Sequence, residues 1–301
     1  MLIRLLSLGL LFIFSLAAEE RSVKEKVLVT ITPYSYFVHA IGGDLFDVEV
    51  MVPQGASAHS FEPNPRQMVE AAQAKLWFVM GESFEPRVVK TIRGMNPSIK
   101  IVDLRKGVDL IRGDESHLHE GHCHDGHCHK GGLCLSQGFD PHVWLSPREM
   151  KVQVNTIRDS LIEMHPEKRE EFERNTQELQ HKLDAVEQQL NLILPKSDPL
   201  TILVSHPSFG YLARDFGLSQ VTIEFEGREP TQKQILAVVQ TAKSAHINTI
   251  FTQPQHPSKG AKVIAEYLGA SLVEVNPYSD NYFENLKKMA ELFAKSRPES
   301  K

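Results

Sequence analysis

The chain has few cysteines and no excess of positive charge. Its three cysteines, Cys123, Cys128 and Cys134, lie within one short stretch, so they do not pair along the chain as the disulfides of a stapled fold do. The net charge of -5 provides no basic field, which makes nucleic acid and other polyanions poor partners. With 301 residues and 41% hydrophobic side chains, the chain can instead bury one large core or two medium ones.

Three enzyme signatures are also missing from the sequence. It contains no H-E-x-x-H helix, no glycine loop of the kind that cradles phosphate and no nucleophile elbow. Each of these motifs places catalytic groups at a fixed spacing, so their absence disfavours the corresponding chemistries. We therefore predict that the chain is not an enzyme.

Residues 1–18 have the pattern of a secretory signal peptide. Arg4 is followed by an apolar run from Leu5 to Leu16 and then by small residues, with cleavage expected after Ala17 or Ala18. The run is shorter than the ~20 apolar residues that a membrane span needs. No cysteine follows it that could carry a lipid. We expect the mature protein to be free in the periplasm of a two-membrane bacterium.

Two blocks of the chain alternate short β-branched runs with helical patterns. This alternation predicts an α/β fold of two lobes with mainly parallel sheets, an N-terminal lobe over residues 24–165 and a C-terminal lobe over residues 199–301. The expected strands are Val27–Thr32, Val48–Val52, Leu76–Met80, Ile101–Asp103, Thr201–Ser205, Gln220–Ile223, Thr249–Thr252 and Ser271–Val275. Helical patterns between them include Arg66–Ala74, Gln232–Ser244 and Lys259–Leu268.

One long linking helix is predicted over residues 166–195. Pro166 fits its first turn, after a preceding helix that ends near Met164. At 1.5 Å per residue it spans about 40 Å, so we expect a rigid strut along both lobes of a monomer, with a coiled-coil dimer as the alternative. Its apolar positions form a single stripe: Phe172, Leu179, Leu183, Val186, Leu190 and Ile193.

Residues 113–132 are almost free of apolar side chains and predict a loop. Clustered imidazoles there could capture zinc weakly, or the segment is a tolerated polar insertion. Cys123 and Cys128 could bind metal as thiolates or close a small disulfide, which leaves Cys134 over. The histidines of this loop are His117, His119, His122, His124, His127 and His129.

Three other histidines lie in a different setting, each after or near the end of an expected strand. These are His59, His142 and His206. Ligands of open parallel sheets bind at the carboxyl ends of the strands, so side chains from two lobes can converge on the cleft between them. Three imidazoles with one oxygen donor or water make a tetrahedral zinc site.

Four segments, three of which contain one of these histidines, resemble one family. The strings AHSFEPNPRQM, DPHVWLSP, SHPSFGYLARDFGL and EGREPTQKQ are similar to those of the zinc-binding periplasmic receptors of ABC transporters. The resemblance runs over nearly the whole mature chain in the same order, and the histidine-rich insertion matches as well. It implies a receptor that binds one Zn²⁺ between two lobes and delivers it to a permease in the inner membrane.

The resemblance also implies the ligands. Its first three ligand positions fall on His59, His142 and His206. Manganese and iron members usually have glutamate at the third position, so His206 favours zinc. The fourth position, a carboxylate in the family, is Asn276 here.

Asn276 can offer only a neutral carbonyl oxygen. The fourth ligand is therefore expected to be Asn276 or a water molecule. Glu224, Glu226 and Asp280 are the acidic alternatives.

Three other functions stay open at this point. A manganese or iron receptor would share the fold, but hard ions prefer oxygen donors. A periplasmic zinc buffer or metallochaperone would use the histidine-rich loop as its main site and need no transporter. A zinc hydrolase would need a carboxylate base such as Glu62 or Glu224.

Overall fold

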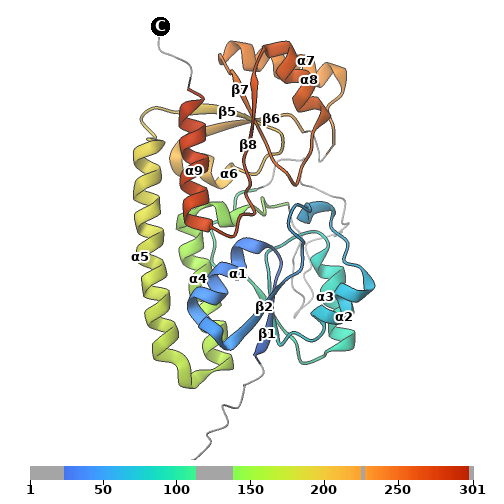
Figure 1. Ribbon diagram of the computed structural model, residues 1–301, viewed down its shortest axis with the longest axis vertical. Helices are drawn as coiled ribbons and strands as arrows, with labels where there is room; N and C mark the ends of the chain where they lie inside the picture. Colours follow the sequence, from blue (N-terminus) through green and yellow to red (C-terminus); the bar gives the residue numbers. More distant parts are fainter. Residues whose placement is uncertain (1–23, 113–137, 225–227, 298–301) are drawn as a thin grey trace, which may run out of the picture.

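The computed structural model describes residues 24–112, 138–224 and 228–297, which form two lobes stacked along the long axis of the molecule (Figure 1). Each lobe contains a four-stranded sheet in which all neighbouring strands are parallel. This arrangement confirms the predicted α/β fold with two parallel sheets.

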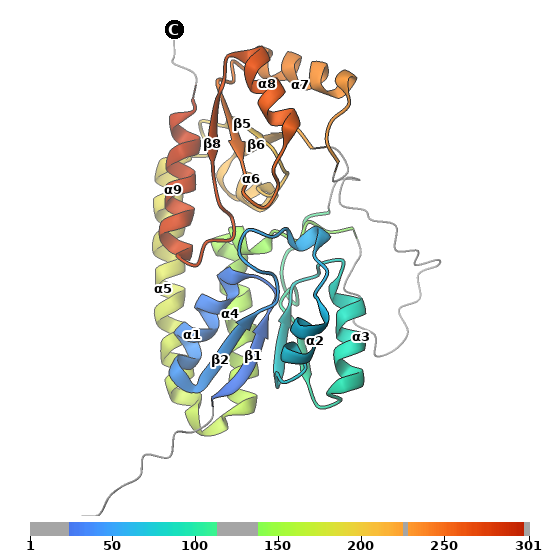
Figure 2. The same ribbon diagram turned by 45° about the vertical axis from the view of Figure 1, so that its right-hand side comes forward.

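In the first lobe the strand order is β2-β1-β3-β4. Helix α1 lies on one side of the sheet, and α2 and α3 lie on the other (Figures 1 and 2). Because both faces are covered, central strand β3 is apolar throughout and central strand β1 is apolar over its last three residues, as buried parallel strands usually are. The elements are β1 (Glu25–Val29), α1 (Thr32–Gly42), β2 (Phe46–Val50), α2 (Pro65–Ala71), β3 (Leu76–Val79), α3 (Glu85–Met95) and β4 (Lys100–Asp103).

The second lobe repeats this order with β6-β5-β7-β8. Helices α7 and α8 pack against each other beside its sheet (Figure 2). The same connection pattern places the carboxyl ends of both sheets toward the junction between the lobes. The elements are β5 (Leu200–Val204), α6 (Gly210–Phe216), β6 (Leu218–Thr222), α7 (Gln232–Ser244), β7 (Thr249–Thr252), α8 (Lys259–Leu268), β8 (Ser271–Glu274) and α9 (Tyr282–Lys295).

The lobes are joined by α4 (Pro147–Met164) and the long helix α5 (Arg169–Ile193). The 25 residues of α5 span about 37 Å, and the helix packs against α1 and α4 of the first lobe and against α9 (Figure 1). The predicted stripe is buried within the chain, so it is not available for a coiled-coil dimer. Its buried members are Phe172, Leu179, Leu183, Val186 and Leu190, and Ile193 is partly buried.

The larger of two hydrophobic cores in the described residues runs through both lobes. It extends from strand β1 to Phe293 of α9 and includes the fully buried Trp144 between the lobes. A smaller core lies under α7 and α8. The shared core means that the two lobes are packed together and not merely tethered.

Several element predictions were wrong at their ends, most of them by one or two residues and two of them by three residues at the carboxyl end. The strand expected over Val27–Thr32 ends at Val29, and α1 begins at Thr32. Pro33 in the first turn explains the change, because its fixed φ and missing N–H suit a helix start. The helix expected over Arg66–Ala74 ends at Ala71.

Some sequence predictions fall outside the described residues. These are the signal peptide over residues 1–18, the histidine-rich loop over residues 113–132 with Cys123, Cys128 and Cys134, and Glu226. Among the residues that are described, the helices are all too short or too polar to cross a membrane.

Candidate metal site

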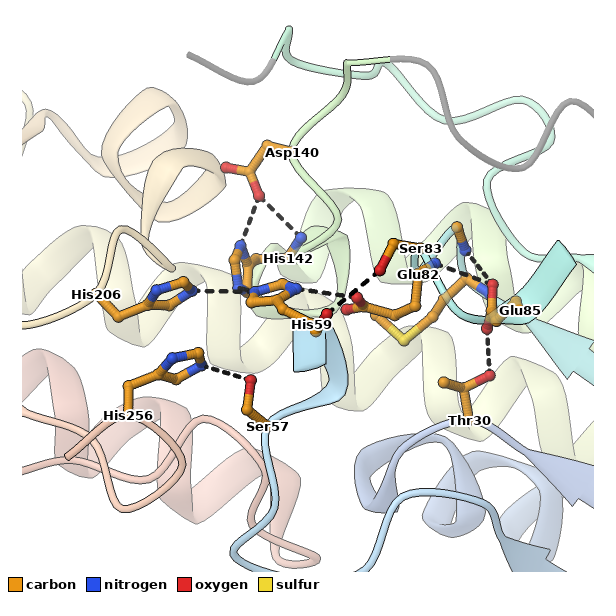
Figure 3. A network of polar contacts seen from close by, with 12 residues as sticks. Thr30, Ser57, His59, Glu82, Ser83, Glu85, Asp140, His142, His206 and His256 are labelled. Atoms are coloured by element: carbon orange, nitrogen blue, oxygen red, sulfur yellow. Dashed lines mark hydrogen bonds and ion pairs between the residues drawn. The ribbon is translucent and has the colours of Figure 1, made fainter. Parts of the chain in front are cut away.

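The loops that follow the strand ends of the two lobes meet at a cluster of histidines (Figure 3). His59 lies in a 3-10 turn, η2 (Ala58–Ser60), after β2, and His206 follows β5. His142 immediately precedes another 3-10 turn, η4 (Val143–Leu145), which leads into α4. One histidine thus comes from each lobe and one from the segment that connects them.

The three side chains point their Nε2 atoms at one another. The His59 Nε2 atom lies 3.2 Å from that of His142 and 3.0 Å from that of His206. Two nitrogens that share a tetrahedral zinc ion at Zn–N distances of about 2.0 Å are about 3.3 Å apart. The spacing in the cluster is close to that value, so the predicted trio is brought together.

A carboxylate contacts the other ring nitrogen of each histidine. The Nδ1 atom of His59 lies 2.9 Å from Oε2 of Glu82, and that of His142 lies 2.7 Å from Oδ1 of Asp140. The Nδ1 atom of His206 lies 2.6 Å from Oε2 of Glu224.

These contacts fix the orientation of the three rings. Each carboxylate accepts a hydrogen bond from a protonated Nδ1, which leaves the lone pair of Nε2 for a ligand, as in metal-binding histidines generally. Three lone pairs then converge on one point, which suits a cation.

The carboxylates are themselves held in place by the backbone. Oδ1 of Asp140 also accepts the backbone N–H of His142 at 2.9 Å. Glu82 lies in the turn after β3, and Oε2 of Glu85 accepts the backbone N–H groups of both Gly81 and Glu82. Gly81 has a φ of +100°, which only glycine adopts easily, so this turn depends on it.

Burial and charge give the site a preference for positive ions. The side chains of His142 and His206 are 1% and 3% exposed, and that of His59 is 17% exposed. Burial would lower the pKa of His59, but the charge and hydrogen bond of Glu82 outweigh it and raise the pKa. Burial raises the pKa of Glu224 to about 7, although the nearby His59 opposes this shift. The carboxylates therefore stabilise a cation held by the rings.

Asn276 makes other contacts. Its Oδ1 atom accepts hydrogen bonds from Nε2 of Gln255 at 2.7 Å and from the backbone N–H of Tyr278 at 3.0 Å. Asp280 is exposed in the turn before α9. Glu224 orients His206, as described above, and the exposed Glu62 forms an ion pair with Arg87.

A fourth histidine, His256, was missed by the sequence prediction. Its ring stacks on that of His206, with centroids 3.6 Å apart and planes 3° apart. His59, His206 and His256 each offer one ring nitrogen as a possible ligand, and these three atoms lie within 4.8 Å of one another. His256 follows β7 as His206 follows β5, so its place after a strand of the second sheet was the signal that could have found it.

The fold and the site define a two-lobed binding protein whose ligand lies where the strand ends of both lobes meet. The model of the family described as the zinc-uptake complex component A, periplasmic, matches residues 27–296. The chain belongs to this family, as the resemblance in the sequence predicted.

Relatives and solved structures agree with this family. A putative metal-binding protein of Chlamydia muridarum is 31% identical over 95% of the chain and 97% of its own length. The high-affinity zinc uptake system protein ZnuA of Bacillus subtilis is 30% identical over 86% of the chain and 80% of its own length. A crystal structure of a ZnuA deletion mutant with zinc bound has a TM-score of 0.80 at 30% identity, over 93% of this chain and all of that one.

Family membership establishes the general role. The chain is a metal-binding receptor and not an enzyme. The ion pair of Glu62 with Arg87 and the contact of Glu224 with His206 also give both suggested hydrolase bases other partners.

Proposed function

We propose that the protein is a periplasmic zinc receptor that captures Zn²⁺ with His59, His142 and His206 and delivers it to an ABC-type permease. The supporting observation is the convergence of three Nε2 atoms, each from a ring whose Nδ1 contacts a carboxylate. The name of the family and the zinc-bound structure support the same ion. Export would depend on the signal-like residues 1–18, and the receptor would act as a monomer.

The donor atoms favour zinc over manganese. Imidazole nitrogen is a good ligand for zinc, whereas manganese prefers carboxylate, carbonyl and water oxygens. The carboxylates of Glu82, Asp140 and Glu224 face Nδ1 atoms and orient the rings. The donor atoms that converge on one point are therefore the three Nε2 nitrogens. Asn276 stays a prediction for the fourth ligand.

The division of the ligands between the lobes suggests how the ion is released. His59 belongs to the first lobe and His206 to the second, so a small tilt of the lobes would separate their Nε2 atoms. Metal–nitrogen bonds are short and directional, so a separation of less than 1 Å weakens them strongly. A permease that binds both lobes could cause such a tilt.

A competition titration tests the histidine assignment. Purified protein and its His142→Ala variant would be titrated with Zn²⁺ against a chelator of known affinity. Structural zinc sites hold about 10–16 kcal/mol across four ligands, so loss of one ligand should weaken binding at least about 100-fold. His181→Ala, which removes an exposed histidine of α5, should bind as the wild type does. Equal affinity of the His142→Ala variant and the wild type would contradict the proposal.

Delivery to a permease needs a test in cells. A bacterial strain that lacks its own zinc receptor but carries the matching permease should grow under zinc chelation only when this protein is supplied. The His142→Ala variant should fail to restore growth. Rescue by that variant would favour a zinc buffer that uses the histidine-rich loop.

A further inference from the structure

We infer that His256 is the fourth protein ligand of the ion, which makes the centre an assembly of four imidazoles. The inference rests on the proposed function, because it concerns the same site. It assigns the fourth position to a residue that follows β7 in place of an oxygen donor at Asn276.

The position of His256 supports this role. Its ring lies face to face with that of His206, and its centroid is 5.5 Å from that of His59. Its Nε2 atom lies 3.4 Å from Oγ of Ser57, which belongs to the same loop as His59. His256 therefore extends from the second lobe to the metal-binding loop of the first (Figure 3).

A side-chain rotation of His256 would bring its ring closer to an ion shared with His59 and His206. Candidate ligand atoms of His59, His206 and His256 already lie within 4.8 Å of one another, and a tetrahedral zinc ion brings two nitrogens to about 3.3 Å. Since stacked rings direct their lone pairs in parallel, the His256 ring must tilt away from His206 for both to reach one ion.

The loop that carries His256 is hydrogen-bonded to the loop that carries His206. Nε2 of Gln253 donates to the carbonyl oxygen of His206 at 3.0 Å, and Oε1 of Gln253 accepts from Oγ of Ser208 at 2.9 Å. The backbone N–H of His256 donates to the carbonyl oxygen of Gln253 at 3.0 Å. Gln253 is buried, so it fixes the two histidines relative to each other.

Asn276 acts in this arrangement as a positioning residue. Its Oδ1 atom accepts two hydrogen bonds, and one of them comes from Gln255, the neighbour of His256. An oxygen that bound the ion would have to give up these bonds. The carboxylate that the family has at this position and the histidine at position 256 are thus two different ways to complete the site.

The substitution His256→Phe tests the inference, because phenylalanine can keep the stack on His206 while it removes both ring nitrogens. X-ray absorption at the zinc edge should give four imidazole ligands for the wild type and three for the variant. Zinc affinity measured by chelator competition should fall at least tenfold. The preference for Zn²⁺ over Mn²⁺ should fall as well, because the replacement ligand would be water.

The variant Asn276→Ala is the matched comparison. It should keep the imidazole count of the wild type and lose less zinc affinity than His256→Phe. Loss of an oxygen ligand in Asn276→Ala, three imidazoles in the wild type, or unchanged zinc affinity in His256→Phe would each overturn the inference and leave the zinc receptor intact. Fewer than three imidazoles in the wild type would instead contradict the proposed function.

Discussion

At the scale of single residues, the carboxylate behind each histidine determines how well the ring can bind an ion. Glu224 contacts Nδ1 of His206 at 2.6 Å, and the same oxygen, Oε2, lies 3.9 Å from Nδ1 of His256. It would therefore act on a bound ion through these rings. Loss of such a partner commonly costs about 10–100-fold in metal affinity. We therefore expect Glu224→Gln to weaken zinc binding by about tenfold or more in a chelator competition assay.

The control for this substitution is Glu62→Gln, which removes an equal charge from an exposed ion pair with Arg87. Exposed pairs contribute about 0–1 kcal/mol, and zinc affinity should stay within twofold of the wild type. Equal effects of the two substitutions would show that only the overall charge matters.

Part of this site could be predicted from the sequence. His59, His142 and His206 were predicted because each lies within a segment that resembles a known family, and His59 and His206 also follow strands β2 and β5. Their carboxylate partners were harder to predict, because Glu82 is 23 residues from His59 and only the fold brings them together. His256 was missed because the polar turn around it, Gln253–Ser258, resembles an ordinary loop.

A second prediction at this scale concerns Glu85, which is fully buried under the turn that carries Glu82. Burial raises the pKa of Glu85 from 4.5 to about 7, although hydrogen bonds from Thr30 and the backbone oppose the shift. The folded state therefore holds this proton more tightly than the unfolded state. The contribution of Glu85 to stability is present below about pH 4.5 and is lost as the pH rises through about 7.

Unfolding of the metal-free protein by urea would measure this effect. The variant Glu85→Gln cannot ionise, so its stability relative to the wild type should increase between about pH 5 and pH 8, by about 3 kcal/mol at most for a shift from 4.5 to about 7. Glu62→Gln should show no such trend. A difference between Glu85→Gln and the wild type that is independent of pH would contradict the assigned shift.

At the scale of elements, the long helix α5 is stabilised by one buried stripe. Leu183 is fully buried in that stripe, whereas Leu192 on the same helix is 83% exposed. We expect Leu183→Ala to lower the free energy of unfolding by about 2–5 kcal/mol. Leu192→Ala should change it by less than about 0.5 kcal/mol.

Thermal or urea unfolding of both variants would provide the comparison. Similar losses for the two would mean that the stripe is not packed against α1, α4 and α9. Since neither residue contacts the histidine cluster in the described structure, zinc affinity below the unfolding range should stay unchanged in both variants.

The elements themselves were largely predictable because their signals are local. The helices Gln232–Ser244 and Lys259–Leu268 and the strand Thr249–Thr252 have the bounds that periodicity predicted. The end of β1 was missed because Ile31 and Thr32 have high β propensity, whereas Pro33 starts a helix there. The helix-start signal of Pro33 therefore outweighs the β propensity of the two residues before it.

At the scale of the whole molecule, the shared core and α5 restrict how far the lobes can move. The core runs from β1 to α9. A wide hinge opening would expose part of its apolar surface to water, at a free-energy cost of about 25 cal/mol per Å². We predict that small-angle X-ray scattering gives the same radius of gyration, within error, for the zinc-free and the zinc-loaded protein. A clear compaction on zinc binding would show a hinge larger than this packing allows.

The central claim is that zinc binds to ring nitrogens where the two lobes meet. Anomalous scattering at the zinc edge from crystals of the zinc-loaded protein tests it most directly. We expect one strong peak within about 2.0–2.1 Å of the Nε2 atoms of His59, His142 and His206. A strong peak at the histidine-rich loop alone, or at an oxygen-lined site away from these three rings, would contradict it.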